Sequence, residues 1–199
     1  MKQALLTLAD VQAGHPFRGS VPFVKDGNAF ALQMRDLSPN GDIAWDGLIR
    51  TEVDANKPVQ WLRPGDVVFV ARGSRNYAVS VRDVPKPTVC SPHVFLLRIK
   101  SPTVLPAFLA WQINRAPAQR YLASNAEGSD QLSIRRPVLE AMPLAVPPLA
   151  EQQLIVALAD AAAHEEQQYQ ALIRNRQQQL DALAHALLSS SESLSEPTP

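Results

Sequence analysis

The chain lacks the sequence patterns of disulfide cross-links, membrane spans and cofactor-binding loops. Cys90 is the one cysteine among 199 residues, so an internal disulfide is excluded and a reducing compartment is favoured. The glycines are isolated and form no phosphate- or dinucleotide-binding pattern. No hydrophobic run approaches the roughly 18 residues of a membrane span, and the N-terminal residues lack the features of a signal peptide. We therefore expect a soluble cytoplasmic protein with no membrane partner.

Catalytic and metal-binding patterns are missing as well. The sequence contains neither the Asn-Pro-Pro-aromatic motif of amino-methyltransferases nor the Asp and Glu-x-Lys pair of a nuclease metal site. Cys90 and His93 together supply half of the four ligands that a zinc site needs. A buried thiol next to a turn histidine explains this pair better than a metal does. We expect no catalytic residue, no metal and no cofactor.

The formal net charge is zero, but the charges are unevenly distributed. Residues 1–148 hold 17 Lys and Arg against 12 Asp and Glu, whereas residues 149–199 hold 2 against 7. A basic globe favours a polyanionic partner, and an acidic helix favours a protein partner. An excess of this size is also common on solvated surfaces, so it supports an assignment without making one.

The most informative segment is the C-terminal third. After Pro147-Pro148 the chain continues to Leu188 without another proline or glycine, which predicts one helix over residues 149–188. From Ala150 to Leu188 such a helix would measure about 58 Å, too long to be buried along its whole length on a domain of this size. Apolar residues at intervals of three, four or seven form one stripe along it: Ile155, Leu158, Ala162, Tyr169, Leu172, Leu180, Leu183 and Leu187.

Two interpretations of this stripe remain open. A narrow stripe interrupted by Glu165, Arg176 and Gln179 is typical of a coiled-coil seam, in which polar residues can select register and partner number. The alternative is an amphipathic helix packed on its own domain. We favour the seam because an unbroken helix beyond about 25 residues is typical of coiled coils. Residues 189–199, rich in serine and proline, are expected to form a disordered tail.

Residues 1–148 combine short strands with short helices, which predicts an α+β globe. Strands are expected at 30–34, 65–70, 77–81, 94–99 and 144–146, with a hairpin connection across 72–76. A helix is expected at 105–115 with Pro106 in its first turn, and a short helix or turn at 137–142. Segments 120–126 and 131–134 are compatible with strand or irregular structure.

One motif at the boundary between globe and helix carries a family resemblance. The run PLAVPPLAEQQLI at 143–155 resembles the phrase that joins a target recognition domain to a conserved helix in the specificity (S) subunits of type I restriction-modification systems. The segments at 62–81, 94–114 and 128–160 also resemble that family. Typical members carry two recognition domains and two helices, and this chain has one of each. It therefore resembles a half-subunit.

The resemblance implies a function and partners. The chain would bind double-stranded DNA sequence-specifically and direct a separate DNA methyltransferase to it, with a restriction subunit as a further candidate partner. In the family the two helices pack antiparallel, which implies here a homodimer through residues 154–187 and a palindromic DNA site. The alternative is a half-subunit that regulates assembly by occupying a partner's helix.

Candidate DNA-binding residues were sought where Arg, Lys and amide side chains fall on polar loops, because these groups contact phosphates and base edges. The densest loop lies between the two strands of the expected hairpin. A second follows the strand at 30–34, and a third surrounds Gly19. For Arg135-Arg136, packing of the side-chain stems is favoured over a phosphate contact. The candidates are Arg18, Lys25, Arg35, Asn40, Arg72, Ser74, Arg75, Asn76 and Tyr77.

Overall fold

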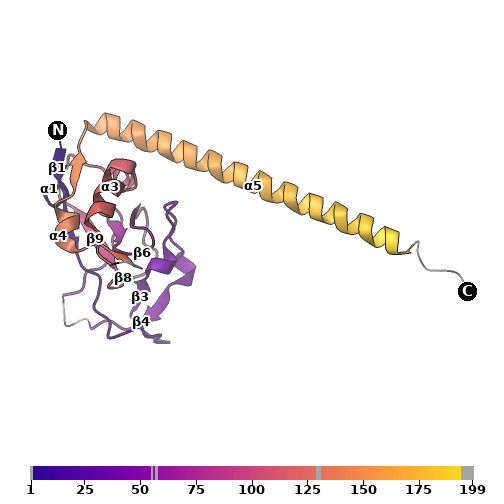
Figure 1. The fold of residues 1–199 in the computed structure, drawn as a ribbon. Helices are drawn as coiled ribbons and strands as arrows, with labels where there is room; N and C mark the ends of the chain where they lie inside the picture. Colours follow the sequence, from indigo (N-terminus) through magenta and orange to yellow (C-terminus); the bar gives the residue numbers. More distant parts are fainter. Residues whose placement is uncertain (1, 55, 57, 129–130, 194–199) are drawn as a thin grey trace, which may run out of the picture. The chain divides into compact units, whose positions relative to one another are not determined.

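The computed structural model describes residues 2–54, 56, 58–128 and 131–193 (Figure 1). By contacts the chain divides into two compact units, Met1–Val156 and Ala157–Pro199. The first unit is a mixed α+β globe, which confirms the predicted fold class. The described residues of the second unit all belong to helix α5 (Leu149–Ser193), so the first turns of this helix are part of the globe.

The centre of the globe is a four-stranded antiparallel sheet with the order β2-β9-β5-β7. The predicted hairpin is confirmed, because Val70 pairs with Tyr77 and Val67 pairs with Ser80. The edge strand β2 was not predicted. The strands are β2 (Ala9–Gln12), β9 (Val94–Ile99), β5 (Val67–Val70) and β7 (Tyr77–Ser80).

Strand β5 is buried on both faces, which explains its uninterrupted run of apolar residues. Successive side chains of a strand point to opposite faces of its sheet. Val67 and Phe69 accordingly pack in the core cluster that contains Phe108 of the helical layer. Val68 and Val70 pack in a second cluster, which contains residues of β3 and β8 from a smaller sheet. The globe therefore has core on both sides of its central sheet.

The smaller sheet has the order β4-β3-β8, with β3 antiparallel to β4 and parallel to β8. Its strands are β4 (Ile49–Thr51), β3 (Ala29–Leu32) and β8 (Thr88–Cys90), and two short 3-10 helices, η1 (Met34–Asp36) and η2 (Trp45–Gly47), follow β3. The predicted strand at 30–34 ends early because Gln33 N–H donates to the Asp36 carboxylate, at 2.8 Å, and begins η1. Figure 1 places β3 and β4 at the end of the globe opposite α3.

Three helices cover the other face of the central sheet: α2 (Pro106–Ile113), α3 (Ala116–Asn125) and α4 (Arg136–Glu140). Each has a proline at its first or second position, where the missing N–H costs nothing. The helices expected at 105–115 and 137–142 are confirmed. The strand or irregular structure expected at 120–126 is wrong: residues up to Asn125 are helical, because Ala118 and Leu122, one turn apart, both pack into the core.

The two ends of the globe meet in a further pair of strands. β1 (Lys2–Ala4) pairs antiparallel with β11 (Pro143–Ala145), and α1 (Leu5–Leu8) follows β1. The short strand β10 (Leu132–Ser133) pairs with β6 (Arg72–Gly73). The strand expected at 144–146 is thus present one residue earlier, and of the two possibilities left open for 131–134 the structure has a short strand.

Gln152 fastens the start of α5 to the globe. Its side chain is fully buried, at 0% exposure. Its Oε1 accepts a hydrogen bond from Leu105 N–H at 2.9 Å, and its Nε2 donates to the carbonyl oxygens of Thr103 and Pro147, both at 2.7 Å. One amide thus satisfies three backbone groups at the junction of α2 and α5. The glutamine of the boundary motif is structural.

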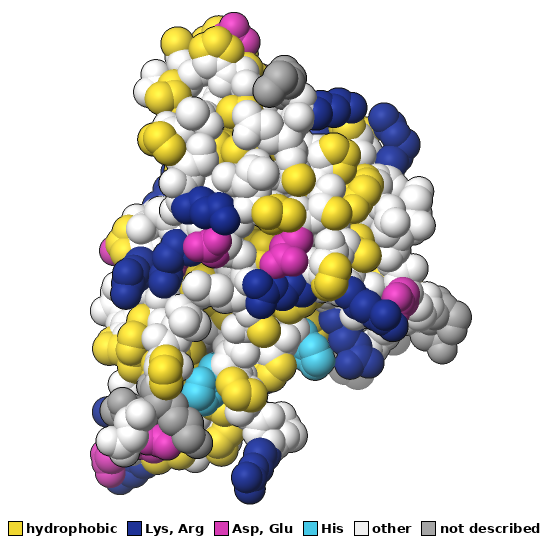
Figure 2. All heavy atoms as spheres, turned by 90° about the vertical axis from the view of Figure 1, so that its left-hand side faces the viewer, with side chains coloured by type: hydrophobic (Ala, Val, Ile, Leu, Met, Phe, Trp, Pro, Cys, Tyr) yellow, Lys and Arg dark blue, Asp and Glu magenta, His cyan; other side chains and the backbone are white. Residues whose placement is uncertain are grey.

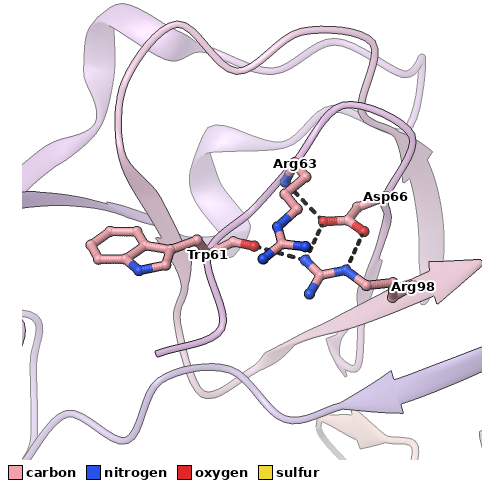
Figure 3. A network of polar contacts seen from close by, with 4 residues as sticks. All are labelled: Trp61, Arg63, Asp66 and Arg98. Carbon is pink, nitrogen blue, oxygen red and sulfur yellow. Dashed lines mark hydrogen bonds and ion pairs between the residues drawn. The ribbon is translucent and has the colours of Figure 1, made fainter. Parts of the chain in front are cut away.

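Asp66 and Arg98 form the principal buried polar network (Figure 3). Arg98 donates from Nε and Nη2 to the two Asp66 carboxylate oxygens at 3.0 and 2.8 Å, and from Nη2 to the Trp61 carbonyl at 2.7 Å. Arg63 N–H also donates to Asp66, at 2.8 Å. The hydrogen bond to Asp66 raises the pKa of Arg98 above its ordinary value. This network ties the turn before β5 to β9.

Cys90 gives a chemical test of this packing. Burial, reinforced by the nearby Asp66 carboxylate, raises the pKa of the Cys90 thiol to about 12. At pH 8 the native thiol is therefore protonated, and we expect it to react with a disulfide reagent only after unfolding in urea. Because the raised pKa belongs to the folded state, its stabilisation is present below pH 9.0 and is lost as the pH rises towards about 12. Immediate labelling of the native protein at pH 8 would contradict this placement.

Helix α5 contains 45 residues and passes the predicted end at residue 188. The disordered tail predicted from residue 189 is wrong for residues 189–193, whose backbone is helical. Serine is only moderately unfavourable in helices, and no proline occurs between Pro148 and Pro197. Residues 194–199 of the predicted tail lie outside the described part of the chain.

Candidate nucleic-acid interface

The loop between β5 and β7 is held in place by a neighbouring segment. β6 within this loop pairs with β10, and Ile134 N–H donates to the Ala71 carbonyl at 2.9 Å. Arg72 Nε donates to Gln131 Oε1 at 3.0 Å. Gly73 has φ +139°, a conformation that side-chain-bearing residues rarely adopt. The loop is therefore an ordered platform for its polar side chains.

An open groove of about 400 Å³ lies beside this loop. Its walls come from the loop, from α3 and from β10, so segments far apart in the sequence meet there. The lining residues are Ser74, Arg75, Asn76, Ala116, Gln119, Arg120, Leu122, Ala123 and Leu132. Among the described residues of this lining, the charged side chains are Arg75 and Arg120, and none is a carboxylate.

Arg75 and Arg120 are both exposed, and neither forms an ion pair within the described part of the chain. Neighbouring arginines differ, since Arg135 pairs with Glu127 and Arg136 pairs with Glu140, each at 2.6 Å. An unpaired guanidinium keeps its planar set of donors for a phosphate or a guanine edge. The groove therefore has the charge and hydrogen-bonding character of a polyanion site.

Two loop residues do not face outward. Asn76 is 5% exposed, and its Nδ2 donates to the Val70 carbonyl at 3.1 Å. Tyr77 is 7% exposed, and its hydroxyl donates to the Leu37 carbonyl at 2.8 Å; burial raises the pKa of that hydroxyl. The prediction that their side chains contact DNA is corrected here, because both are occupied in holding the hairpin. Arg72, Ser74 and Arg75 are exposed, and their contact with DNA stays a prediction.

The second candidate segment lies next to the first. The Tyr77 hydrogen bond to Leu37 connects the strand after the loop with the stretch that carries Arg35 and Asn40, both exposed. Asp36, between them, is buried and caps η1, and burial raises its pKa. Arg35 also lies 3.7 Å from the Asp36 carboxylate, so one exposed cation of this segment has an acidic neighbour.

Arg18 and Lys25 are exposed in the stretch before β3. Within the described residues, no hydrogen bond or ion pair joins either side chain to the other candidates. Their backbone neighbourhood packs beside the smaller sheet, since Val24 N–H donates to the Arg50 carbonyl at 2.9 Å. Neither residue belongs to the lining of the groove.

Figure 2 shows how the charged side chains are distributed over one face of the molecule. Lys and Arg side chains lie there in separate groups, with Asp and Glu side chains among the central ones. Among the described residues of this face, the basic groups form no continuous strip.

The helix stripe is exposed in the single chain. The exposed fractions are 63% for Leu158, 57% for Tyr169, 63% for Leu172, 52% for Leu180 and 60% for Leu183. Ala162 is exposed too, and the Leu187 side chain lies outside the described residues. Ile155 was predicted to belong to the partner-binding stripe, and this is corrected: it is half-buried and packs against the core of the globe. The available stripe therefore begins at Leu158.

Sequence reasoning missed Gln119, Arg120 and Gln152. Gln119 and Arg120 were overlooked because their segment was not identified as a helix; Pro117, a typical first-turn proline, was the available signal. Gln152 lies in the boundary motif, but its burial depends on residues 103–105, which are remote in sequence. The described residues include no group of three His, Cys, Asp or Glu side chains able to hold a metal ion. None of the described helices is long and apolar enough to cross a membrane.

Comparison with known proteins gives a consistent answer at the level of the fold. No family model matches the chain, and no curated protein matches it either. The S subunit of a type I restriction-modification system from M. genitalium matches with a TM-score of 0.56 and 17% identity, covering 97% of this chain and 46% of that one. A chain from a study of assembly and conformational transition of the type I R-M system gives 0.55 and 20%, covering 98% and 42%.

The HsdS subunit from Thermoanaerobacter tengcongensis gives a TM-score of 0.52 and 21% identity, covering 94% of this chain and 39% of that one. The chain thus spans less than half the length of each of these proteins. It has the fold of type I S subunits, which confirms the resemblance drawn from the boundary motif.

Proposed function

Starting from this shared fold, we propose that the chain is a DNA-reading specificity unit that directs a separate DNA methyltransferase to its recognition site. The observation that carries the proposal is the match over 97% of the chain to an S subunit more than twice as long. The matched part of this chain consists of one globe and one long helix and corresponds to 46% of that S subunit. A homodimer through α5 would present two globes to a palindromic site. A restriction subunit as a further partner and a non-catalytic role in the cytoplasm belong to the same proposal.

The groove beside Arg75 supports DNA as the ligand. Phosphate contacts position a protein on DNA, and base contacts give sequence specificity. Arg120 projects from a helix that packs firmly in the core, whereas Arg75 lies on the hairpin loop beside Ser74. We assign Arg75 to base-edge contact and Arg120 to a phosphate, because residues that recognise a ligand are concentrated on loops that a rigid scaffold positions. Arg35 and Asn40 extend this surface.

The proposal is tested by selection from random-sequence duplex DNA with the full-length protein, alone and together with a co-purified methyltransferase. A common retained sequence supports the reader, and a palindromic one supports the homodimer. Capture of a specificity subunit with no retention of any duplex would overturn the reader in favour of the regulatory half-subunit. The salt concentration must be held constant, because phosphate contacts make affinity steeply salt-dependent.

Replacing Arg75 with alanine tests the groove directly. If Arg75 contacts a base, Arg75→Ala should lose about 1–3 kcal/mol of binding free energy for the selected duplex. For a duplex altered at that one base pair, the variant should bind as wild type does. Arg120→Ala is expected to weaken binding to all duplexes alike and to lower the salt slope by about 1. Both are measured by fluorescence anisotropy on the selected duplex and its single-base variants.

Arg136→Ala is the matched control, since it removes one positive charge from a side chain already paired with Glu140. It should leave affinity nearly unchanged. Unchanged affinity of Arg75→Ala for every duplex would remove the groove from the interface.

A further inference from the structure

From Leu158 to Leu183 a regular heptad series runs along α5; it includes three polar residues and excludes Leu180 of the stripe, which lies one position after Gln179. From residue 158 the intervals alternate four and three, which is the spacing of the a and d positions of a coiled coil. Three of these positions are polar, and two of the three carry opposite charges. The series is Leu158, Ala162, Glu165, Tyr169, Leu172, Arg176, Gln179 and Leu183.

Neither seam charge is neutralised within its own helix. Neither Glu165 nor Arg176 has an opposite charge three or four residues away, where helix neighbours meet. The two lie about 16 Å apart along the axis, beyond reach of each other. Glu165 instead accepts a hydrogen bond from the Tyr169 hydroxyl at 2.8 Å. In the described part of the chain Arg176 has no acidic partner.

A second copy could satisfy these charges in one orientation only. A parallel pair places each seam residue opposite its own counterpart, so Glu165 would face glutamate and Arg176 would face arginine. Like charges opposed in a seam are destabilising. An antiparallel pair instead places a positions opposite d positions, so Glu165 can face Arg176 of the second copy.

One antiparallel register brings the charges together. When Glu165 faces Arg176, Tyr169 faces Leu172, Leu158 faces Leu183, and the small Ala162 faces the long Gln179. Every layer occurs twice by symmetry. A shift of one heptad in one direction places Glu165 against Tyr169, and a shift in the other places it against Leu183. Either shift leaves both charges opposite apolar or aromatic side chains.

We propose that the occupant of the α5 stripe is α5 of a second copy, in an antiparallel register centred between Gln170 and Ala171 and selected by two Glu165–Arg176 pairs. The dimer itself rests on the proposed function; the register goes beyond it. Apolar layers drive the association, and the paired charges determine orientation and register, which is the best-attested use of polar seam residues.

Charge reversal in the full-length chain tests the register. By sedimentation equilibrium, Glu165→Arg and Arg176→Glu should each weaken dimerisation at least about tenfold, because each opposes like charges twice. The double variant restores opposite charges in the antiparallel register and should return to within about threefold of wild type. Arg174→Glu, on the outer face of the helix, is the matched control and should dimerise like wild type.

A double variant as weak as the single ones would overturn the register, and equal dimerisation of all four proteins would show that the pair selects nothing. A wild-type monomer at tens of micromolar would overturn the choice of a second copy. None of these results tests the DNA proposal, because the Arg75 groove lies in the globe and DNA binding is measured separately.

Cysteine cross-linking gives an independent readout of orientation. Leu158→Cys and Leu183→Cys chains, refolded together under reducing conditions and oxidised only in the native state, should form a disulfide between the two kinds of chain, and neither variant alone should cross-link to itself. Cys90 does not compete, because its thiol is buried with a pKa of about 12. Self-cross-linking of Leu158→Cys would indicate a parallel pair and overturn the proposal.

Discussion

Replacement of Asp66 by alanine is expected to lower the free energy of unfolding by about 3 kcal/mol. The carboxylate accepts two hydrogen bonds from Arg98 and one from Arg63 N–H, and its side chain is 4% exposed. Its loss strands the guanidinium of Arg98, which is 24% exposed and only partly hydrated. An uncompensated charge at such a site costs more than the hydrogen bonds themselves. Urea unfolding followed by tryptophan fluorescence measures the effect.

Asp10→Ala is the matched control, because Asp10 forms an ion pair of equal length, 2.8 Å, with Lys100 on the surface. Both side chains of that pair are well exposed, at 58% and 44%, so the loss should stay below about 1 kcal/mol. A double Asp66→Ala/Arg98→Met variant removes the stranded charge and should recover part of the stability. Equal losses for Asp66→Ala and Asp10→Ala would show that the buried network contributes nothing special.

The second large effect is expected for Gln152→Ala, which should cost about 3 kcal/mol. The substitution leaves Leu105 N–H and the carbonyls of Thr103 and Pro147 without their partner, in a site closed to solvent. It also opens a small void between the two helices. Thermal unfolding monitored by circular dichroism measures the change in stability.

Gln153→Ala is the control for helix propensity and surface polarity, since Gln153 is the next residue along and is exposed. It should be neutral within about 0.5 kcal/mol. We further expect Gln152→Ala to make the first turn of α5 exchange its amide hydrogens faster than the body of the globe. A loss of stability no larger than that of Gln153→Ala would contradict the anchoring role.

Both networks hold elements that position the proposed DNA-binding groove. Asp66 positions the turn that begins β5, and β5 leads into the loop that carries Arg75. Gln152 joins α5 to the segment preceding α2, and α2 packs on the same strands. Substitution of Asp66 or Gln152 should therefore lower stability while the folded protein keeps its DNA sequence preference. Arg75→Ala should change the sequence preference and leave stability nearly unchanged.

The elements that were predicted from the sequence are those with a strong local pattern. β5, β7, β9 and α2 each combine an apolar run or a helical repeat with clear flanking turns, and each was found at its expected place. The N-terminal strand β2 and the proline-flanked β8 were missed, because their pairing partners lie far along the chain. Helix α3 was misjudged because its two core residues give too short a repeat to separate helix from strand.

For the site, the sequence located the polar loop but could not sort its residues. Arg75 and Asn76 are adjacent and equally polar, yet one is exposed and the other is 5% exposed and bonded to Val70. The partner wall of the groove, with Gln119 and Arg120, lies more than forty residues further along the chain. No periodicity connects such segments.

Patterns between near neighbours in the chain were enough to predict the strand-rich globe, the unbroken helix beyond Pro148 and the heptad series along it. The structure shows in addition that Gln152 is an anchor, that the Asn76 and Tyr77 side chains are buried, and that Arg75 and Arg120 line one groove. Burial and charge pairing are properties of distant segments brought together, and they exist only once the core has formed.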